Sequence, residues 1–219
     1  MLNEKLPFVR GVLITRSRSA ARTYEHTMGA SASSPVAREK QLAKLFAMDA
    51  SRPSDAEAMA KFKKLLPTPD SAVANARQPV DCGSRTVLMV AISLRMGKEV
   101  GQYLVDMGAD LTATDSSGYT VLHWAAMKDD THWATKALEA GVGINQLTSG
   151  KQTALMFACK YQSMEVFQLL MDRGADATIV EPVQSHTALS YARELLDEAD
   201  SEDERQRARE MIQRLEKAT

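Results

Sequence analysis

The stretch TVLHWAA, residues 120–126, decides the fold, because the chain repeats its pattern three more times. The copies are TVLMVAI from Thr86, TALMFAC from Thr153 and TALSYAR from Thr187, so successive threonines lie 34, 33 and 34 residues apart. A period of about 20–50 residues is typical of repeat proteins, in which each repeat is one small unit stacked on the next. The sequence therefore predicts a solenoid.

Each unit predicts a pair of helices. The threonine and the apolar residues after it begin a short first helix, and the pair Ala125 and Ala126 allows close packing on a neighbouring helix. After a polar hinge, the second helix carries apolar residues at helical spacing, as in EVFQLLMD from Glu165. Glycine stands at positions 108, 141 and 174, where a left-handed cap is expected to end the second helix.

The pattern resembles the ankyrin repeat. DSSGYTVLHWAA from Asp115 is similar to that family's D-x-x-G-x-T-x-L-H-x-A-A motif, and the resemblance covers residues 81–219. It implies an all-α ankyrin-repeat solenoid of stacked helix pairs with short β-hairpin-like fingers. It also implies that the finger tips and first helices form a concave face that binds proteins. For His123 it implies a structural role, with the ring bonded to backbone or threonine groups of neighbouring turns.

The N-terminal side departs from the repeat. Residues 34–80 are predicted to be a degenerate capping repeat, with one helix from Pro35 to about Met48. A second helix is expected to run to Leu66 from a capping box, in which a serine hydroxyl and a glutamate three residues later each bind the other residue's backbone N–H. Ser54 and Glu57 provide this pair.

The last repeat is predicted to be a C-terminal cap. Its turn lacks the usual Asp and Gly, and DEADSEDE, residues 197–204, is expected to form a long acidic hinge between its two helices. Ser201 and Glu204 make a second capping-box signature, followed by an apolar stripe of Ala208, Met211, Ile212 and Leu215. A polar outer face on this helix would close the solenoid in water.

Composition limits the classes of function. The formal net charge is −1, so we expect no nucleic-acid partner. The two cysteines, Cys82 and Cys159, form no C-x-x-C pair, which argues against a disulfide framework or a cysteine zinc site. No apolar run approaches the roughly 20 residues of a membrane helix. A cytoplasmic location is the default expectation.

The polar cluster after TVLHWAA does not predict catalysis. His123 and His132 fall at the starts of successive helices, about 12 Å apart, which is too far to share one metal ion. Asp129 and Asp130 are expected to cap the second helix of their repeat. We find no nucleophile and base pair and no phosphate-binding loop, so we predict a protein that is not an enzyme and uses no metal or cofactor.

The predicted function is that of a non-enzymatic adaptor or scaffold, monomeric outside its complex, which binds a protein partner through its concave face. The candidate partner-binding residues are Arg85, Leu94, Tyr119, Met127, Lys128, Gln152, Lys160, Tyr161 and His186. Tyr119, Met127 and Tyr161 are the preferred anchors, because aromatic residues and methionine are enriched in interface cores. The alternative is a structural subunit of an organellar or cytoskeletal assembly.

Residues 1–33 are expected to be a disordered or targeting segment outside the solenoid. Their Arg- and Ser-rich composition fits a mitochondrial transit peptide, although Glu4 and Glu25 weaken that interpretation. Alternatively, translation from Met28 would expose MGASAS and allow myristoylation of Gly29, which would tether the protein to a membrane. Both alternatives stay open at this point.

Overall fold

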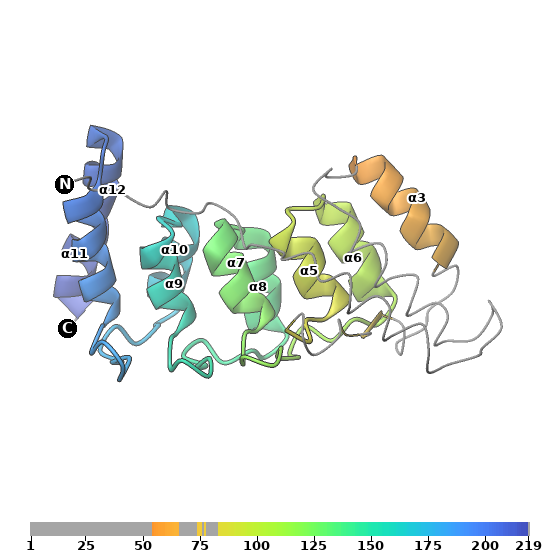
Figure 1. Cartoon of the computed structure of the whole chain (residues 1–219), viewed down its shortest axis with the longest axis horizontal. Coiled ribbons are helices and arrows are strands. Elements are labelled where there is room, and N and C mark those ends of the chain that lie inside the picture. Colours follow the sequence, from red (N-terminus) through yellow and green to blue (C-terminus); the bar gives the residue numbers. More distant parts are fainter. Residues whose placement is uncertain (1–53, 66–73, 76, 78–82, 219) are drawn as a thin grey trace, which may run out of the picture.

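Four pairs of helices stand in a row in the computed structural model, which describes residues 54–65, 74, 75, 77 and 83–218 (Figure 1). The pairs are α5 (Val87–Ser93) with α6 (Lys98–Asp106), α7 (Val121–Lys128) with α8 (Thr131–Glu139), α9 (Ala154–Lys160) with α10 (Met164–Asp172), and α11 (Ala188–Glu198) with α12 (Glu202–Ala218). Helix α3 (Asp55–Leu65) packs against α6 at the opposite end of the row from α11 and α12. The expected helix at 35–48, residues 1–33 and Gly29 lie outside the described residues.

The repeated threonines start the first helices. In each repeat the threonine hydroxyl accepts a hydrogen bond from the backbone N–H three residues further on, at 3.2–3.5 Å. This bond satisfies one of the N–H groups that a helix leaves unpaired at its start. The repeat register predicted from these threonines is therefore confirmed.

The first helices form one continuous layer. Helix α7 contacts both α5 and α9, and α9 also contacts α11. Because α7 and α9 lie between two neighbours and their own partner helix, their first six residues are all buried. Leu155 of α9, for example, is 1% exposed. This all-round burial explains why these short helices are apolar on every side.

The second helices form the other layer, in which α10 contacts α8 and α12. Trp133 of α8 is 2% exposed and packs against Gly101 of α6 in the preceding repeat. A Cβ added to Gly101 would overlap Cζ2 of the Trp133 ring and lie 2.8 Å from its Cη2. The glycine therefore permits the indole to rest directly on the backbone of α6.

Left-handed backbone recurs at equivalent positions. The glycines after the second helices adopt it as predicted, with φ of 96° at Gly108, 95° at Gly141 and 79° at Gly174. It also occurs two residues before each repeated threonine, at Ser84, Gly118, Lys151 and Ser185. Only one of these four finger residues is glycine, so the finger conformation does not depend on glycine.

Asp129 and Asp130 were both predicted to cap α8, but only one of them does so. Asp130 caps α8 as predicted, with Oδ1 accepting from the N–H of Trp133 at 3.2 Å. The same prediction for Asp129 is wrong, because this residue ends α7 in a left-handed conformation that turns its side chain away from α8. Its Oδ1 accepts from the N–H of Val166 at 2.9 Å, in α10 of the following repeat.

Further hydrogen bonds connect consecutive repeats. Asn145 Oδ1 accepts from the N–H of Asp176 at 2.9 Å. In the fingers, the N–H of Ser149 donates to the carbonyl of Ser117 at 2.8 Å, and the N–H of Ser116 donates to the carbonyl of Gly83 at 3.0 Å. The first three fingers are thus joined edge to edge.

The hinge between the two C-terminal helices is shorter than predicted. The acidic hinge expected over residues 197–204 is wrong in extent, because α11 continues through Glu198 and α12 begins at Glu202. Only residues 199–201 connect them. The acids that follow lie in the first turn of α12, where the helix dipole favours negative charge.

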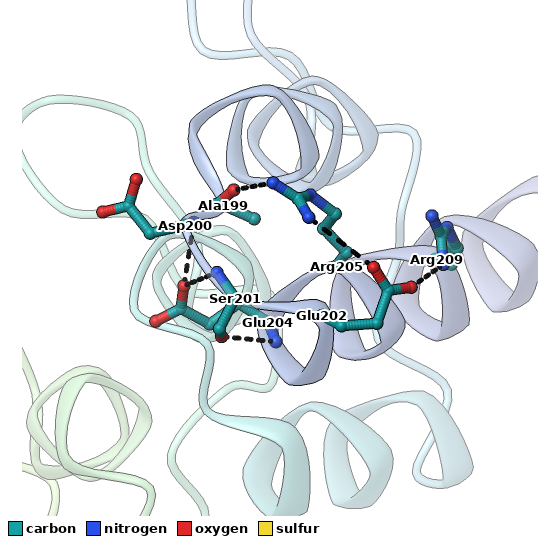
Figure 2. Close-up of polar contacts among 7 residues, drawn as sticks. All are labelled: Ala199, Asp200, Ser201, Glu202, Glu204, Arg205 and Arg209. Carbon is teal, nitrogen blue, oxygen red and sulfur yellow. Dashed lines mark hydrogen bonds and ion pairs between the residues drawn. The ribbon is translucent and has the colours of Figure 1, made fainter.

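The predicted start of α12 is confirmed. Figure 2 shows the capping box: Ser201 Oγ accepts from the N–H of Glu204 at 3.2 Å, and the Glu204 carboxylate accepts from the N–H of Ser201 at 3.3 Å. Arg205 also donates to the carbonyl of Ala199 at 3.0 Å, across the hinge. From the predicted stripe, Ala208, Met211 and Leu215 are fully buried, and Ile212 is partly buried.

Helix α3 lies where the second helix of the N-terminal segment was predicted. Ser54 and Glu57 form the expected capping box, with N–H to side-chain distances of 3.2 and 3.3 Å. The helix is described as far as Leu65, and its Phe62 is 1% exposed. Within the described part of the chain, no helix combines the length and the apolar character needed to cross a bilayer.

Candidate protein-interaction surface

Two columns of side chains run along the first helices. The first column is the residue immediately before each repeated threonine, and the second is the residue four positions after it. The first column consists of Arg85, Tyr119, Gln152 and His186, and the second of Val90, Trp124, Phe157 and Tyr191. All four first-column residues were predicted to contact a partner from the sequence.

The first-column residue of one repeat packs on the second-column residue of the next. The guanidinium carbon of Arg85 lies 5.2 Å from the Trp124 ring centroid. The ring centroids of Tyr119 and Phe157 are 5.3 Å apart. Gln152 Nε2 donates to the Tyr191 hydroxyl at 2.7 Å. The two columns therefore interlock across three repeat junctions.

A third set of residues lies seven and eight positions after each threonine, near the end of the first helix. It contains the remaining predicted residues: Leu94, Met127, Lys128, Lys160 and Tyr161. We call this set, together with the two columns, the finger–helix face. Leu94 and Met127 are partly buried against the core, so both contribute more to packing than to an open surface.

Tyr161 is the most open aromatic side chain of the finger–helix face. It is 46% exposed and stacks on Phe157, with 6.4 Å between the ring centroids and 22° between the ring planes. Lys160 beside it is exposed, with Nζ 5.6 Å from the Tyr191 ring centroid. An exposed ring supported from below by a buried ring fits the anchor predicted at this position.

Tyr119 lies deeper than predicted for a finger tip. It is partly buried, and its ring centroid lies 5.6 Å from that of Trp124 and 5.8 Å from that of His123. Burial raises the pKa of its hydroxyl, and nearby Tyr161 and Asp115 raise it further. The hydroxyl therefore stays protonated at neutral pH. Tyr119 is as much a part of the inter-repeat packing as of the surface.

Lys128 carries a positive charge among other positive charges. It is the last residue of α7 and is partly buried. Burial lowers the pKa of its ammonium group, and the nearby cations of Arg95 and Arg85 lower it further. Burial and like charge thus both disfavour the charged form of this ammonium group.

The other end of the face contains a paired acid. His186 Nε2 lies 3.1 Å from Glu194 Oε1, and the His186 ring meets Tyr191 edge-on at 5.0 Å. Glu181, which is 4% exposed, accepts from the N–H groups of Val183 and Gln184 at 2.7 and 3.1 Å. The Glu181 carboxylate thereby takes the place of the aspartate that the turn of the last finger lacks.

His123 has the structural role that the family resemblance implied. Its Nδ1 accepts from the N–H of Thr120 at 3.1 Å, and its Nε2 lies 3.1 Å from the carbonyl of Gln146 in the next finger. Burial lowers its pKa to about 4. The neutral ring with the proton on Nε2 fulfils both bonds, so His123 joins two repeats.

The chemistry available elsewhere is limited. Among the residues that the structure describes, no three His, Cys, Asp or Glu side chains come together as metal ligands. Cys159 is completely buried, and burial raises the pKa of its thiol. A buried thiol of this kind is a poor nucleophile.

Sequence reasoning missed part of the face. Tyr191 was given no role, and Phe157 was treated only as part of the repeat. The signal was present in the four aligned copies, whose fifth letters are V, W, F and Y. A bulky residue at one repeat position predicts a continuous row once the repeats stack in register.

The fold defines a class: a solenoid of helix pairs whose fingers and first helices form one long surface. Comparison with protein families then identifies the repeat. Residues 122–199 match a family model described as ankyrin repeats in three copies, and residues 97–138 match another described as ankyrin repeats in many copies. Residues 97–199 thus consist of ankyrin repeats, and ankyrin repeats generally mediate protein–protein interaction.

Curated relatives share this part of the chain. An ankyrin repeat protein of Acanthamoeba polyphaga mimivirus is 31% identical over 94 residues, 43% of this chain and 12% of its own length. The E3 ubiquitin-protein ligase KEG of Arabidopsis thaliana is 34% identical over 100 residues, 43% of this chain and 6% of its own length. XBOS33 of Oryza sativa, also described as an E3 ubiquitin-protein ligase, is 37% identical over 71 residues, 32% of this chain and 14% of its own length. The chain thus spans a small part of each relative.

Proposed function

We propose that this chain is a non-enzymatic adaptor that binds a partner protein through its finger–helix face. The observation that carries the proposal is Tyr161, an exposed ring stacked on buried Phe157 at the centre of an interlocked row of aromatic side chains. Aromatic anchors of this kind dominate binding energy at protein interfaces.

The rigidity of the face supports binding. The edge-to-edge hydrogen bonds of the fingers and the Gln152–Tyr191 bond hold the surface in one arrangement before a partner arrives. A preformed surface loses little conformational entropy on association, so more of the contact energy appears as affinity. Other solenoids of stacked repeats also bind their partners through an extended concave surface of this kind.

The proposal is restricted to binding. Two relatives are described as E3 ubiquitin-protein ligases, but this chain matches only 6% and 14% of their lengths, within its repeats. The engaged ring of His123 and the buried thiol of Cys159 favour structural roles over catalysis. We therefore do not transfer ligase activity to this chain.

The test compares two variants of the same repeat. Tyr161→Ala removes the exposed anchor from α9, and Gln168→Ala removes an exposed side chain from α10 in the other helix layer. Partners captured from the native source by the wild-type chain should be lost with Tyr161→Ala and kept with Gln168→Ala. Equal capture by both variants, with both folded by circular dichroism, would refute binding through this face.

A further inference from the structure

Aromatic rings follow one another along the finger–helix face from the second repeat to the fourth. Trp124, Phe157 and Tyr191 each stand four residues after a repeated threonine. Tyr119 contacts the first two, with its ring centroid 5.6 Å from that of Trp124 and 5.3 Å from that of Phe157. Tyr161, which is 46% exposed, stacks on Phe157. A partner therefore meets a series of flat rings rather than isolated side chains.

The polar groups of these rings have protons to donate. The hydroxyls of Tyr119 and Tyr161 form no hydrogen bond with another residue in the described part of the chain. The Tyr191 hydroxyl oxygen accepts from Gln152 Nε2 at 2.7 Å, which leaves its own proton available. The indole N–H of Trp124, a residue only 7% exposed, has no acceptor among the described residues. A carbonyl from a partner would satisfy this N–H once the side chains over it shift, and such shifts are common on binding.

The carboxylates next to these rings are already engaged. Asp115 is 8% exposed, and its Oδ1 accepts from two backbone N–H groups, one of them that of Tyr119, both at 2.9 Å. Glu181 is 4% exposed and also accepts from two backbone N–H groups. Glu194 Oε1 lies 3.1 Å from His186 Nε2. A partner that supplies hydrogen-bond acceptors would therefore fit this face better than one that supplies donors.

The spacing of the repeats matches one turn of a polyproline II helix. The first helices α7, α9 and α11 contact one another in that order and stand in a row (Figure 1). Packed helices lie about 8–10 Å apart, so the equivalent rings of Phe157 and Tyr191 belong to helices at about that interval. A polyproline II helix has three residues per turn and rises about 3.1 Å per residue, so each of its sides recurs about every 9 Å. Residues three apart in such a segment would reach successive repeats.

We propose that the finger–helix face binds a proline-rich segment of its partner in the polyproline II conformation, with one proline against Tyr119 and Tyr161 and another, three residues away, beside Tyr191. The inference rests on the proposed function and deepens it by naming the chemistry of the partner. Proline has no N–H to leave unpaired, and the carbonyls of a polyproline II helix are free to accept from the tyrosine hydroxyls. Its rings pack on aromatic side chains, and its conformation is formed before binding.

The full chain can be tested against a display library of random linear peptides. Selected peptides should share two prolines with two residues between them. In synthetic copies, moving one proline by a single residue should weaken binding about tenfold, because the two prolines then face different sides of the helix. Affinity should change by less than about twofold when salt is added, because the proposed contacts carry no net charge.

Two variants of one residue separate the ring of Tyr161 from its hydroxyl. Tyr161→Ala removes both and should weaken the selected peptides about thirtyfold, as expected for an aromatic anchor. Tyr161→Phe keeps the ring on Phe157 and loses one neutral hydrogen bond, so it should weaken them about threefold. The control is Gln168→Ala, an exposed position of α10 in the other helix layer, which should leave affinity unchanged. Circular dichroism of each variant checks that the fold is retained.

Each other outcome overturns the inference. Peptides without proline that are lost with Tyr161→Ala would refute the proline-rich class and leave the proposed function intact. Proline-containing peptides that bind equally to wild type and Tyr161→Ala would refute the site. A strong loss of affinity with salt would show that charges rather than rings hold the segment. If no peptide is selected, a linear segment is the wrong occupant, and concentration-dependent dimers that Tyr161→Ala abolishes would identify a second copy of this chain instead.

Discussion

Replacing Gly101 with alanine should destabilise the protein, although alanine is the better helix former. Gly101 lies within α6, where the substitution alone should gain about 1 kcal/mol of helix propensity. The new Cβ, however, would overlap Cζ2 of Trp133 and lie 2.8 and 2.9 Å from Cη2 and Cε2. Carbon atoms pack favourably at about 3.5–4.0 Å, so the ring or the backbone must move.

The steric cost should exceed the gain in propensity. Trp133 is 2% exposed and is surrounded by core residues, so it cannot swing aside into solvent. Overpacking of a well-packed core costs about 1–3 kcal/mol, and a direct overlap with a buried ring belongs at the upper end. After subtraction of the propensity term, the free energy of unfolding should fall by about 2 kcal/mol.

Urea unfolding followed by tryptophan fluorescence would measure this change, since the two tryptophans, Trp124 and Trp133, are both buried. Gly143→Ala is the control: its added Cβ would meet nothing closer than 3.7 Å, so the unfolding midpoint should hardly move. Adding Trp133→Phe should relieve Gly101→Ala, because phenylalanine lacks the outer ring atoms. A Gly101→Ala protein as stable as wild type would refute the close approach of α6 and α8.

Two further predictions concern polar groups at repeat junctions. The pKa of His123 is about 4 in the folded protein, below its usual value of about 6.5, so its neutral form stabilises the fold above pH 6.5 and this contribution is lost as the pH falls towards 4. The advantage in unfolding free energy of wild type over His123→Asn should therefore shrink by about 3 kcal/mol between pH 7 and 4, and an advantage independent of pH would contradict this. Asp129→Ala should cost about 1 kcal/mol and increase amide exchange at Val166, because the N–H of Val166 loses its acceptor. Asp129→Asn should preserve both properties, since asparagine tolerates the left-handed backbone and offers an amide oxygen; equal stability of the two variants would rule out this cap.

The repeat register was predictable because it depends on local patterns. A threonine that caps its own helix, a glycine in a left-handed cap and a serine and glutamate three residues apart each act within one turn of the chain. The helices from Thr86 onwards and the capping boxes at Ser54 and Ser201 were therefore found from sequence. Even the role of His123 followed, because the family motif already includes its contact with threonine.

Contacts between repeats were harder to predict. Gly101 attracted no attention in the sequence, because its partner Trp133 lies in the next repeat and only the stacking distance makes a small residue necessary. Asp129 was assigned to the nearest helix start, whereas its left-handed backbone directs it to a helix one repeat away. The depth of Tyr119 likewise depends on Phe157 of the following repeat. Local sequence does not specify these distances.

The bonds between repeats give the array a direction. Asp129, Asn145 and Ser117 each supply an oxygen from an earlier repeat to a backbone N–H of the next one. Loss of a later repeat leaves oxygens that water can solvate, whereas loss of an earlier repeat leaves the helix or finger after it without its acceptor. Helix α10 and the finger at Ser149 thus depend on the repeat before them, so the array should unravel more easily from its C-terminal end than from its N-terminal end.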